Sequence, residues 1–347
     1  MSTYPRPQNS PYMQFLTKAG HTIGPLTLTL LARILIRSSS KYHRGVARRL
    51  LFSASALNEP TATLQLVSEG LGKSDLANPQ LEEPLRRLST LGKTNKNPSA
   101  MILLGQILER QGKADKALDF YEEVVNTKND RYGGAEDEDS NIAQAWLALG
   151  RIKAQGRDLA GAKAALKKAA LEFDDPTAYF YMARFRDPKS DDYLLYNLKA
   201  ASSGISEAAH NLGIFYLQRS KSDQQTSSSI ETRLDDGRDA TLGAPQTTSA
   251  QTLSSTDSAK GLLRNTSNGM SLHETRTMAY EWFAVAAEGG FAPSQVNLAL
   301  LLRGDGLYDD GMAWLKHAEG HPNLGAEVER LKGKWWNKKV NLSGNVP

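Results

Sequence analysis

The sequence predicts an all-α protein, a right-handed α-solenoid of antiparallel helix pairs. The first observation is the stretch Pro98–Val124, where two amphipathic helices are separated by Gln111-Gly112-Lys113. The second is that the same hairpin recurs at Ala143–Ala169, with its turn at Gly156-Arg157-Asp158. The third is the composition: 347 residues, 40% of them hydrophobic, with no cysteine. The lack of cysteine excludes disulfides, thiolate metal sites and a cysteine nucleophile.

The two hairpins align residue by residue. Gly105 matches Gly150 and Ala117 matches Ala162, which are small residues where two helices would approach most closely. The other matched pairs are Met101 with Trp146, Leu104 with Leu149, Tyr121 with Leu166, and Val124 with Ala169. This Trp–Leu–Gly…Ala…Phe/Tyr…Ala spacing resembles the tetratricopeptide repeat, which implies a stack of helical hairpins.

A related pattern begins further along the chain. Leu198–Gly204 followed by Glu207–Tyr216 reads Lys-Ala-Ala-x-x-Gly and then Ala-x-x-x-Leu-Gly-x-x-Tyr, and a similar string returns at Tyr280–Gly289 and Ala313–Glu319. These strings resemble the Sel-one-like repeat, a close relative of the tetratricopeptide hairpin. We therefore expect repeats over residues 98–218 and Sel-one-like repeats over residues 275–320.

The N-terminal residues 1–57 contain eight Lys/Arg and no acid, whereas the rest of the chain has 34 basic and 38 acidic residues, a net charge of −4. This composition resembles a mitochondrial transit peptide, and Arg48–Ser55 resembles a matrix-protease site, so we expect a disordered segment cleaved within residues 50–60. A membrane anchor and a plain basic tail are the alternatives. The apolar run Ile23–Ile36 is shorter than the roughly 20 residues that span a bilayer, and it contains Pro25 and Arg33.

The remaining boundaries follow from local composition. Residues 58–97 predict a degenerate hairpin that caps the array, because terminal repeats are atypical. Residues 219–274, rich in Ser, Thr, Gln and Asp, predict a disordered insertion between the two helices of one repeat. The alternative is a linker between two domains. Residues 321–347 predict a capping helix and a tail, with Trp335 and Trp336 either sealing the core or anchoring a partner.

No motif in the sequence indicates an enzyme, a cofactor or a metal site. His317 and His321 are separated by Gly320, lack the adjacent Glu of a zinc-protease helix, and fit a helix C-terminus without metal. The acidic loop expected over residues 128–140 lacks the ligand spacing of a calcium loop. We therefore predict a non-enzymatic protein.

The expected functional surface is the concave groove of the solenoid. Its candidate residues are Ile102, Gln106, Glu109 and Arg110 in one repeat, with Leu147, Arg151 and Ala154 in the next. The Lys and Asn of the clamp with which tetratricopeptide domains hold chaperone tails are not matched. Arg110 and Arg151 could hold a carboxylate, and solvated helix faces are the plainer interpretation.

The leading hypothesis is a mitochondrial adaptor, in the matrix or on the matrix face of the inner membrane, that binds protein partners. The Sel-one-like resemblance implies respiratory-complex assembly or membrane-protein quality control. Peripheral association with a membrane is compatible with this hypothesis, and no small-molecule substrate is expected. The alternative is an RNA-associated helical-repeat factor for the mitoribosome or for transcript processing, which would need a basic groove although the body is net negative.

Overall fold

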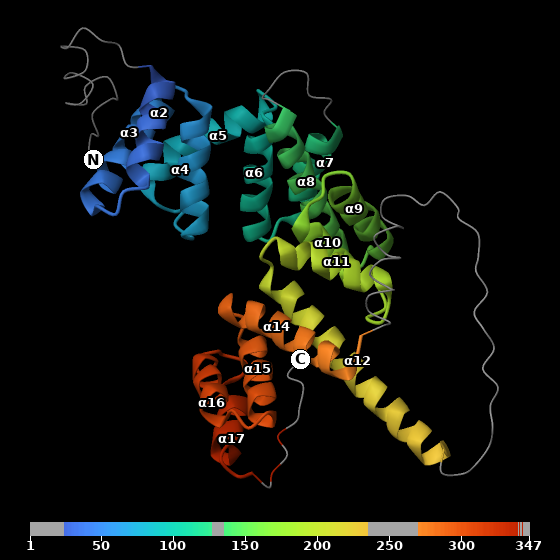
Figure 1. The fold of residues 1–347 in the computed structure, drawn as a ribbon. Coiled ribbons are helices and arrows are strands. Elements are labelled where there is room, and N and C mark those ends of the chain that lie inside the picture. Colours follow the sequence, from blue (N-terminus) through green and yellow to red (C-terminus); the bar gives the residue numbers. More distant parts are fainter. Residues whose placement is uncertain (1–23, 127–134, 235–269, 339, 341, 343–347) are drawn as a thin grey trace. The chain divides into compact units, whose positions relative to one another are not determined.

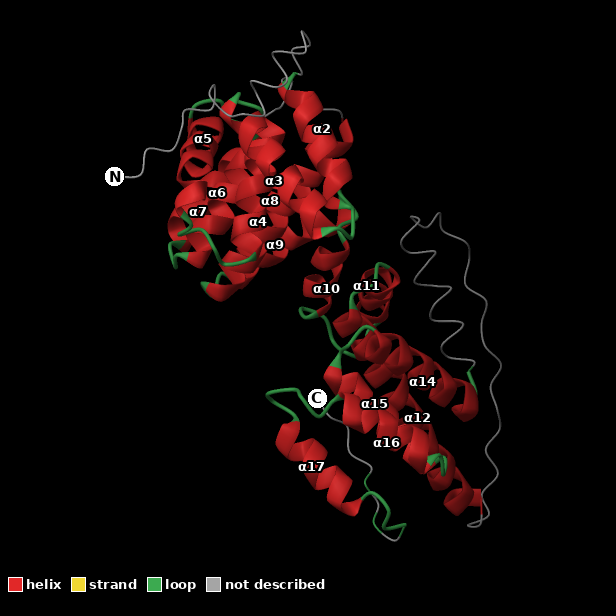
Figure 2. Cartoon of the chain, turned by 90° about the vertical axis from the view of Figure 1, so that its left-hand side faces the viewer, coloured by secondary structure: helices red, strands yellow, loops and turns green. Residues whose placement is uncertain are grey.

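The computed structural model describes residues 24–126, 135–234, 270–338, 340 and 342, and every secondary-structure element in these ranges is helical (Figure 2). The predicted all-α architecture of stacked helix pairs is confirmed. The chain forms two compact units, Met1–Ala169 and Ala170–Pro347. None of the described helices is long and apolar enough to cross a membrane.

In unit 1, successive helices pack against their chain neighbours, and alternate helices such as α4 and α6 also touch (Figure 1). The helices of this unit are α2 (Pro25–Ile36), α3 (Lys41–Ala56), α4 (Pro60–Gly72), α5 (Glu82–Lys93), α6 (Pro98–Arg110), α7 (Ala114–Asn126), α8 (Ala135–Gln155) and α9 (Leu159–Leu171), with a 3-10 turn at Pro79–Leu81.

The start of α6 shows how the sequence determines these boundaries. The Asn97 side chain accepts a hydrogen bond from the Ala100 N–H at 2.9 Å, and Pro98 occupies the first helical turn. Such a cap satisfies a backbone donor that the helix itself leaves free, and proline there sacrifices no helical hydrogen bond. At the other end, Gly112 takes the left-handed backbone conformation, φ 71°, that turns the chain into α7.

In the two aligned hairpins, α6–α7 and α8–α9, a glycine of the first helix faces a large side chain of the second. A Cβ placed at Gly105 would lie 2.6 Å from Cζ of the fully buried Tyr121, and one at Gly150 would lie 2.5 Å from Cγ of Leu166. Ala117 and Ala162 are also fully buried. The expected packing role of these aligned residues is therefore confirmed.

The structure differs from the prediction of a disordered segment over residues 1–57. Helices α2 and α3 pack on each other and on α4, and Leu28, Ala47, Leu51 and Ala54 lie in one buried cluster with Leu66 of α4. The prediction of disorder rested on the lack of acidic residues, and charge does not indicate which apolar residues share a helix face. Residues 1–23 lie outside the described residues.

Two other predicted boundaries in this unit shift. The 58–97 hairpin, α4 and α5, follows an earlier helix pair instead of ending the described array. The acidic loop predicted over residues 128–140 lies partly outside the described residues, and α8 already begins at Ala135.

In unit 2, α12 extends to Leu234, well into the predicted insertion 219–274, of which residues 235–269 lie outside the described residues. The helices on either side of that segment pack against each other, so it does not separate two domains. The helices of this unit are α10 (Pro176–Ala183), α11 (Asp191–Ser202), α12 (Ser206–Leu234), α14 (Leu272–Glu288), α15 (Ala292–Gly304), α16 (Tyr308–His317) and α17 (Gly325–Lys334).

The contact between α12 and α14 repeats the pattern of unit 1. A Cβ at Gly213 would lie 2.6 Å from the ring of Phe283, which is fully buried. Beside it, His210 is 5% exposed, its Nδ1 lies 2.7 Å from the Ser294 hydroxyl, and its ring faces Phe283 and Phe291. Burial among these apolar rings lowers the pKa of His210 to about 4.

The C-terminal pair of tryptophans divides into two roles. Trp335 is fully buried against α15–α17, and its indole N–H donates to the Tyr308 carbonyl at 2.9 Å, whereas Trp336 is 58% exposed. Arg303 donates to the carbonyls of Trp335, Asn337 and Val340, which holds the chain end against the core. Packing by Trp335, the plainer of the two predicted roles, is confirmed.

Gly105→Ala should lower the free energy of unfolding by about 1–3 kcal/mol, because the new methyl group overlaps the Tyr121 ring. The matched control is Gly45→Ala, also within a helix, where a Cβ meets nothing within 4 Å, so it should raise stability by up to about 1 kcal/mol. Urea denaturation followed by circular dichroism measures both. Equal stability of the two variants would contradict this packing.

The free energy of unfolding of unit 2 should fall as the pH is lowered from about 6.5 to about 4. In this range His210 is protonated in the unfolded state but still neutral in the folded state, so protonation favours unfolding. The loss should be up to about 3 kcal/mol, as each pKa unit corresponds to about 1.36 kcal/mol. Urea unfolding at several pH values measures it. His210→Gln should flatten the slope, whereas exposed His273→Gln should leave it unchanged; an unchanged slope in His210→Gln would refute the assignment.

Candidate functional site

A groove of about 470 Å³ opens in unit 1, between alternate helices of the array. Its walls come from α4, α6 and α8, the first helices of three successive pairs, and Arg33 of α2 contributes at one end. The lining residues are Arg33, Thr61, Leu64, Gln65, Ser68, Ser99, Ile102, Leu103, Gln106, Asn141 and Gln144.

The groove is lined mainly by uncharged groups that can form hydrogen bonds. Amides and hydroxyls, which both donate and accept hydrogen bonds, account for most of the lining, and Arg33 is the single charged residue among the described residues that form it. Leu64, Ile102 and Leu103 add an apolar strip. Ser99 Oγ donates to Asn141 Oδ1 at 3.1 Å, which links α6 to α8 across the groove.

The structure brings two of the candidate residues into this groove, Ile102 and Gln106. Ile102 is 4% exposed and belongs to the floor, whereas the Gln106 side chain is exposed and free to reach a ligand. Leu147 and Ala154 are partly buried, and neither is among the described residues that line the groove.

Glu109 and Arg151 are paired with each other instead of lining the groove. Arg151 donates to Glu109 Oε2, and the Tyr121 hydroxyl donates to Glu109 Oε1 at 2.6 Å. Burial, reinforced by the hydrogen bond to this carboxylate, raises the pKa of Tyr121. The Glu109 side chain is only 13% exposed, so the cluster joins α6, α7 and α8 structurally.

Arg110 also has an intramolecular partner. Its guanidinium donates to the Leu71 carbonyl at the end of α4 and, at 3.2 Å, to the Ser74 hydroxyl. The two arginines that could have held a partner's carboxylate thus hold helices of unit 1 together.

The sequence analysis did not predict most of the polar groove residues, although the alignment of the two hairpins indicates some of them. In the alignment of the two hairpins, Ser99 occupies the position of Gln144, one turn before the candidates Ile102 and Leu147. Extending the candidate face by one turn would have found both. Gln65 and Ser68 lay in a hairpin too degenerate to align.

A second cleft, of about 800 Å³, lies between α3 and α4 and is basic. Lys41, Arg44 and Arg48 line it from α3, and Lys73 and Glu69 line it from α4. Lys73 is paired with Glu69 at 2.5 Å, whereas the buried Nε of Arg48 has no hydrogen-bond partner. This cleft therefore carries an excess of positive charge that the described residues do not neutralise.

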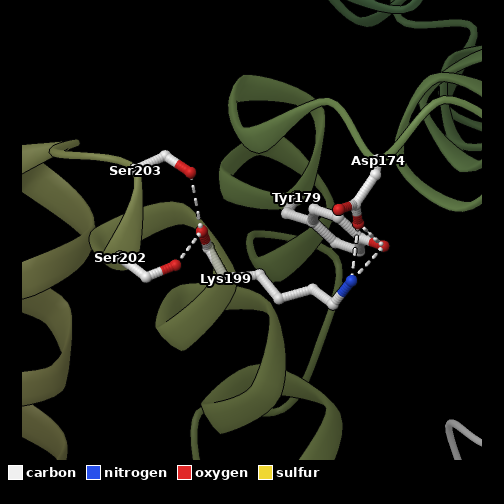
Figure 3. A network of polar contacts seen from close by, with 5 residues as sticks. All are labelled: Asp174, Tyr179, Lys199, Ser202 and Ser203. Atoms are coloured by element: carbon white, nitrogen blue, oxygen red, sulfur yellow. Dashed lines mark hydrogen bonds and ion pairs between the residues drawn. The ribbon is translucent and has the colours of Figure 1, made fainter.

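In unit 2, Lys199, Tyr179 and Asp174 form a polar cluster between α10, α11 and the turn before α10 (Figure 3). Lys199 Nζ lies 2.5 Å from Asp174 Oδ1 and 3.0 Å from the Tyr179 hydroxyl, which itself donates to Asp174 at 2.9 Å. Burial acts to lower the pKa of Lys199, but the hydrogen bonds to Asp174 and Tyr179 outweigh it and leave that pKa raised. A nucleophilic lysine needs a lowered pKa, so the role of this cluster is structural: it links α10, α11 and the turn before α10.

The described part of the chain also offers no constellation for metal chemistry: no group of three or more His, Asp or Glu side chains there could hold an ion. His317 packs beside Trp314, and His321 Nδ1 accepts from the Asn323 N–H at 3.4 Å. Both histidines thus have ordinary local contacts.

Comparison with known proteins agrees with this geometry. The tetratricopeptide repeat family pattern matches residues 98–131, which include α6 and α7. The structure is similar to c5321, a protective antigen of uropathogenic Escherichia coli strains displaying an SLR fold, with a TM-score of 0.56 at 16% identity, covering 94% of this chain and 60% of that one. A Sel1 repeat protein from Oxalobacter formigenes aligns over 95% of both chains at 18% identity with a TM-score of 0.36. No curated protein sequence matches the chain.

This chain spans about three fifths of the length of the Escherichia coli antigen, so the likeness concerns architecture and not the whole activity of that protein. Proteins with tetratricopeptide or Sel-one-like repeats are typically scaffolds for protein–protein interaction and are generally non-catalytic. The helix pairs, the glycine contacts and these similarities together identify the fold as a solenoid of tetratricopeptide and Sel-one-like helical repeats.

Proposed function

We propose that this chain is a non-enzymatic adaptor that binds an extended segment of a protein partner in the groove of unit 1. The observation that carries the proposal is the lining of that groove: amides and hydroxyls from α4, α6 and α8 beside an apolar strip. An extended peptide offers backbone N–H and C=O groups along its length, which the amides of Gln65, Gln106 and Gln144 could satisfy in both directions.

The same lining favours a protein segment over RNA. An RNA-binding groove needs cations along the phosphate backbone and aromatic rings on which bases stack. Among the described residues of this groove, Arg33 supplies the single positive charge and no residue is aromatic. A neutral or weakly acidic peptide with small apolar side chains matches the groove better.

Photocrosslinking tests this proposal in cells. A benzophenone amino acid at Gln106 or Gln144 should yield a discrete crosslinked protein, because both side chains are exposed at the groove. The matched control is the same amino acid at Lys116, exposed on α7 and outside the groove. Replacing both glutamines by Ala should reduce recovery of that partner about tenfold, since each lost hydrogen bond costs about 0.5–1.5 kcal/mol. Identical bands from all three positions would contradict the groove assignment.

We also propose mitochondrial import, to the matrix or the matrix face of the inner membrane, with a role in respiratory-complex assembly or membrane-protein quality control. The acid-free N-terminal composition supports import, and the resemblance to Sel-one-like proteins supports the role. The packing of Leu51 and Ala54 modifies the expected processing, because cleavage within residues 50–60 would remove α2 and most of α3 from the core of unit 1.

The mature protein should therefore begin upstream of Pro25. A fluorescent fusion of residues 1–60 should reach mitochondria, and N-terminal sequencing of the full chain purified from them should locate the cut before α2. A cytosolic fusion would refute import. A mature N-terminus within residues 50–60 would instead show that α2 and α3 are dispensable for the folded protein.

A further inference from the structure

Helix α2 has two apolar faces, and unit 1 covers only one of them. Leu28 and Ala32 are buried against the neighbouring helices. On the other side, four large apolar side chains are exposed on this one helix: Leu26 57%, Leu30 49%, Leu31 41% and Ile34 67%. A helix with large apolar side chains exposed along one side has a face that needs a partner.

The exposed face changes from apolar to basic along its length. Leu26, Leu30, Arg33 and Arg37 follow one another at steps of four, three and four residues, so they share one side of the helix. Arg33 and Arg37 are exposed. The helix has 12 residues, about 18 Å in length, well short of the roughly 30 Å hydrocarbon core of a bilayer. It can therefore lie along a surface but cannot cross a membrane.

The positive charges next to the exposed apolar residues of α2 are not neutralised by any carboxylate among the described residues. Residues 1–57 contain no acid, and among the described residues no carboxylate lies within ion-pair distance of any basic side chain of α2 and α3 or of the turn between them. Those side chains are Arg33, Arg37, Lys41, Arg44, Arg48 and Arg49. The basic cleft, with its unpartnered Arg48 Nε, opens beside the same turn, at Ile36 and Lys41. The partner must therefore combine an apolar phase with negative charge.

The need for both an apolar phase and negative charge decides which partner fits the exposed face of α2. A second copy of the chain meeting face to face would set the same arginines against each other. The preceding residues 1–23 bring Arg6 and Lys18 and no acid, so they would add positive charge. An anionic lipid–water interface provides acyl chains for the leucines and phosphates for the arginines, within the few Å that a helix lying in the interface reaches.

We propose that unit 1 docks on anionic membrane surfaces through α2, with Leu26, Leu30 and Ile34 inserted at the interface and Arg37 and Lys41 on lipid phosphates. This surface adjoins the peptide groove, because Arg33 lies on the same side of α2 as Leu26 and Leu30 and also lines the groove. The adaptor would thus hold its partner next to a membrane without spanning it.

Vesicle flotation with the full chain tests the proposal. The protein should float with vesicles of phosphatidylcholine mixed with phosphatidylserine, but not with phosphatidylcholine alone, and binding should weaken as salt is raised. Leu30→Gln with Ile34→Gln should lower partitioning about tenfold or more, and Arg37→Gln with Lys41→Gln should do the same. The matched control is Leu159→Gln with Leu307→Gln, two leucines exposed elsewhere at 58% and 49%, which should bind like the unmodified chain.

Urea unfolding and sedimentation of the same variants separate the alternatives. Unchanged stability with lost flotation supports the proposal, because all four altered side chains are exposed. Three results would overturn the proposal. In the first, the unmodified chain does not float; in the second, the Leu30/Ile34 variant floats as well as the control variant. In the third result, the chain is a dimer that the Leu30/Ile34 substitutions dissociate, and it does not bind vesicles. A lowered unfolding midpoint without loss of flotation would assign the exposed face of α2 to the chain's own N-terminal residues.

Discussion

The close approach of two helices at a glycine is the contact that sets the geometry of three helix pairs, α6–α7, α8–α9 and α12–α14. At Gly105 the ring of Tyr121 occupies the place of a Cβ, at Gly150 the branched carbon of Leu166 does so, and at Gly213 the ring of Phe283 does so. A large side chain on one helix thus fits against bare backbone on the other. Because interiors are close-packed, this fit sets the spacing within each pair and with it the surface on which the next pair stacks.

The groove follows from that regular stacking. When pairs stack in register, their first helices α4, α6 and α8 lie in sequence, and equivalent turns of each face the same opening. Ser99 is brought next to Asn141 and Gln144 in this way, although Asn141 is 42 residues away in the sequence. Other charged groups near the groove connect neighbouring helices: Glu109 pairs with Arg151, and Arg110 bonds to the end of α4. Arg33 is therefore the single charged residue among the described residues that line the groove. This scarcity of positive charge is what favours a peptide backbone over a nucleic acid.

The basic and acidic residues are distributed unevenly along the chain. Eight basic residues and no acids lie in residues 1–57, while the rest of the chain is net negative. Several cations elsewhere in the described structure lie within hydrogen-bond distance of a carboxylate, as Lys199 does with Asp174 and Arg330 with Glu327. On α2 and α3 the basic side chains meet none among the described residues, and exposed leucines lie beside them. The exposed apolar surface is unfavourable in water, and the unpaired cations beside it favour a negatively charged partner for this end of unit 1.

The sequence by itself determined the helix pairs, their period and the glycine contacts, because local spacing decides which residues share a helix face. It also located α14 as the partner of α12 across a long insertion, since the repeat pattern survives on both sides. Only the tertiary structure decided the roles of α2 and α3, of Arg110 and Arg151, and of the amides that line the groove. A basic amphipathic segment has the same composition whether it is a leader or the first helix pair of a core. An arginine on a helix face has the same sequence signature whether it points to solvent or to the carbonyl of Leu71. In both cases the difference lies in which helix packs beside the residue, and that depends on contacts far away in the chain.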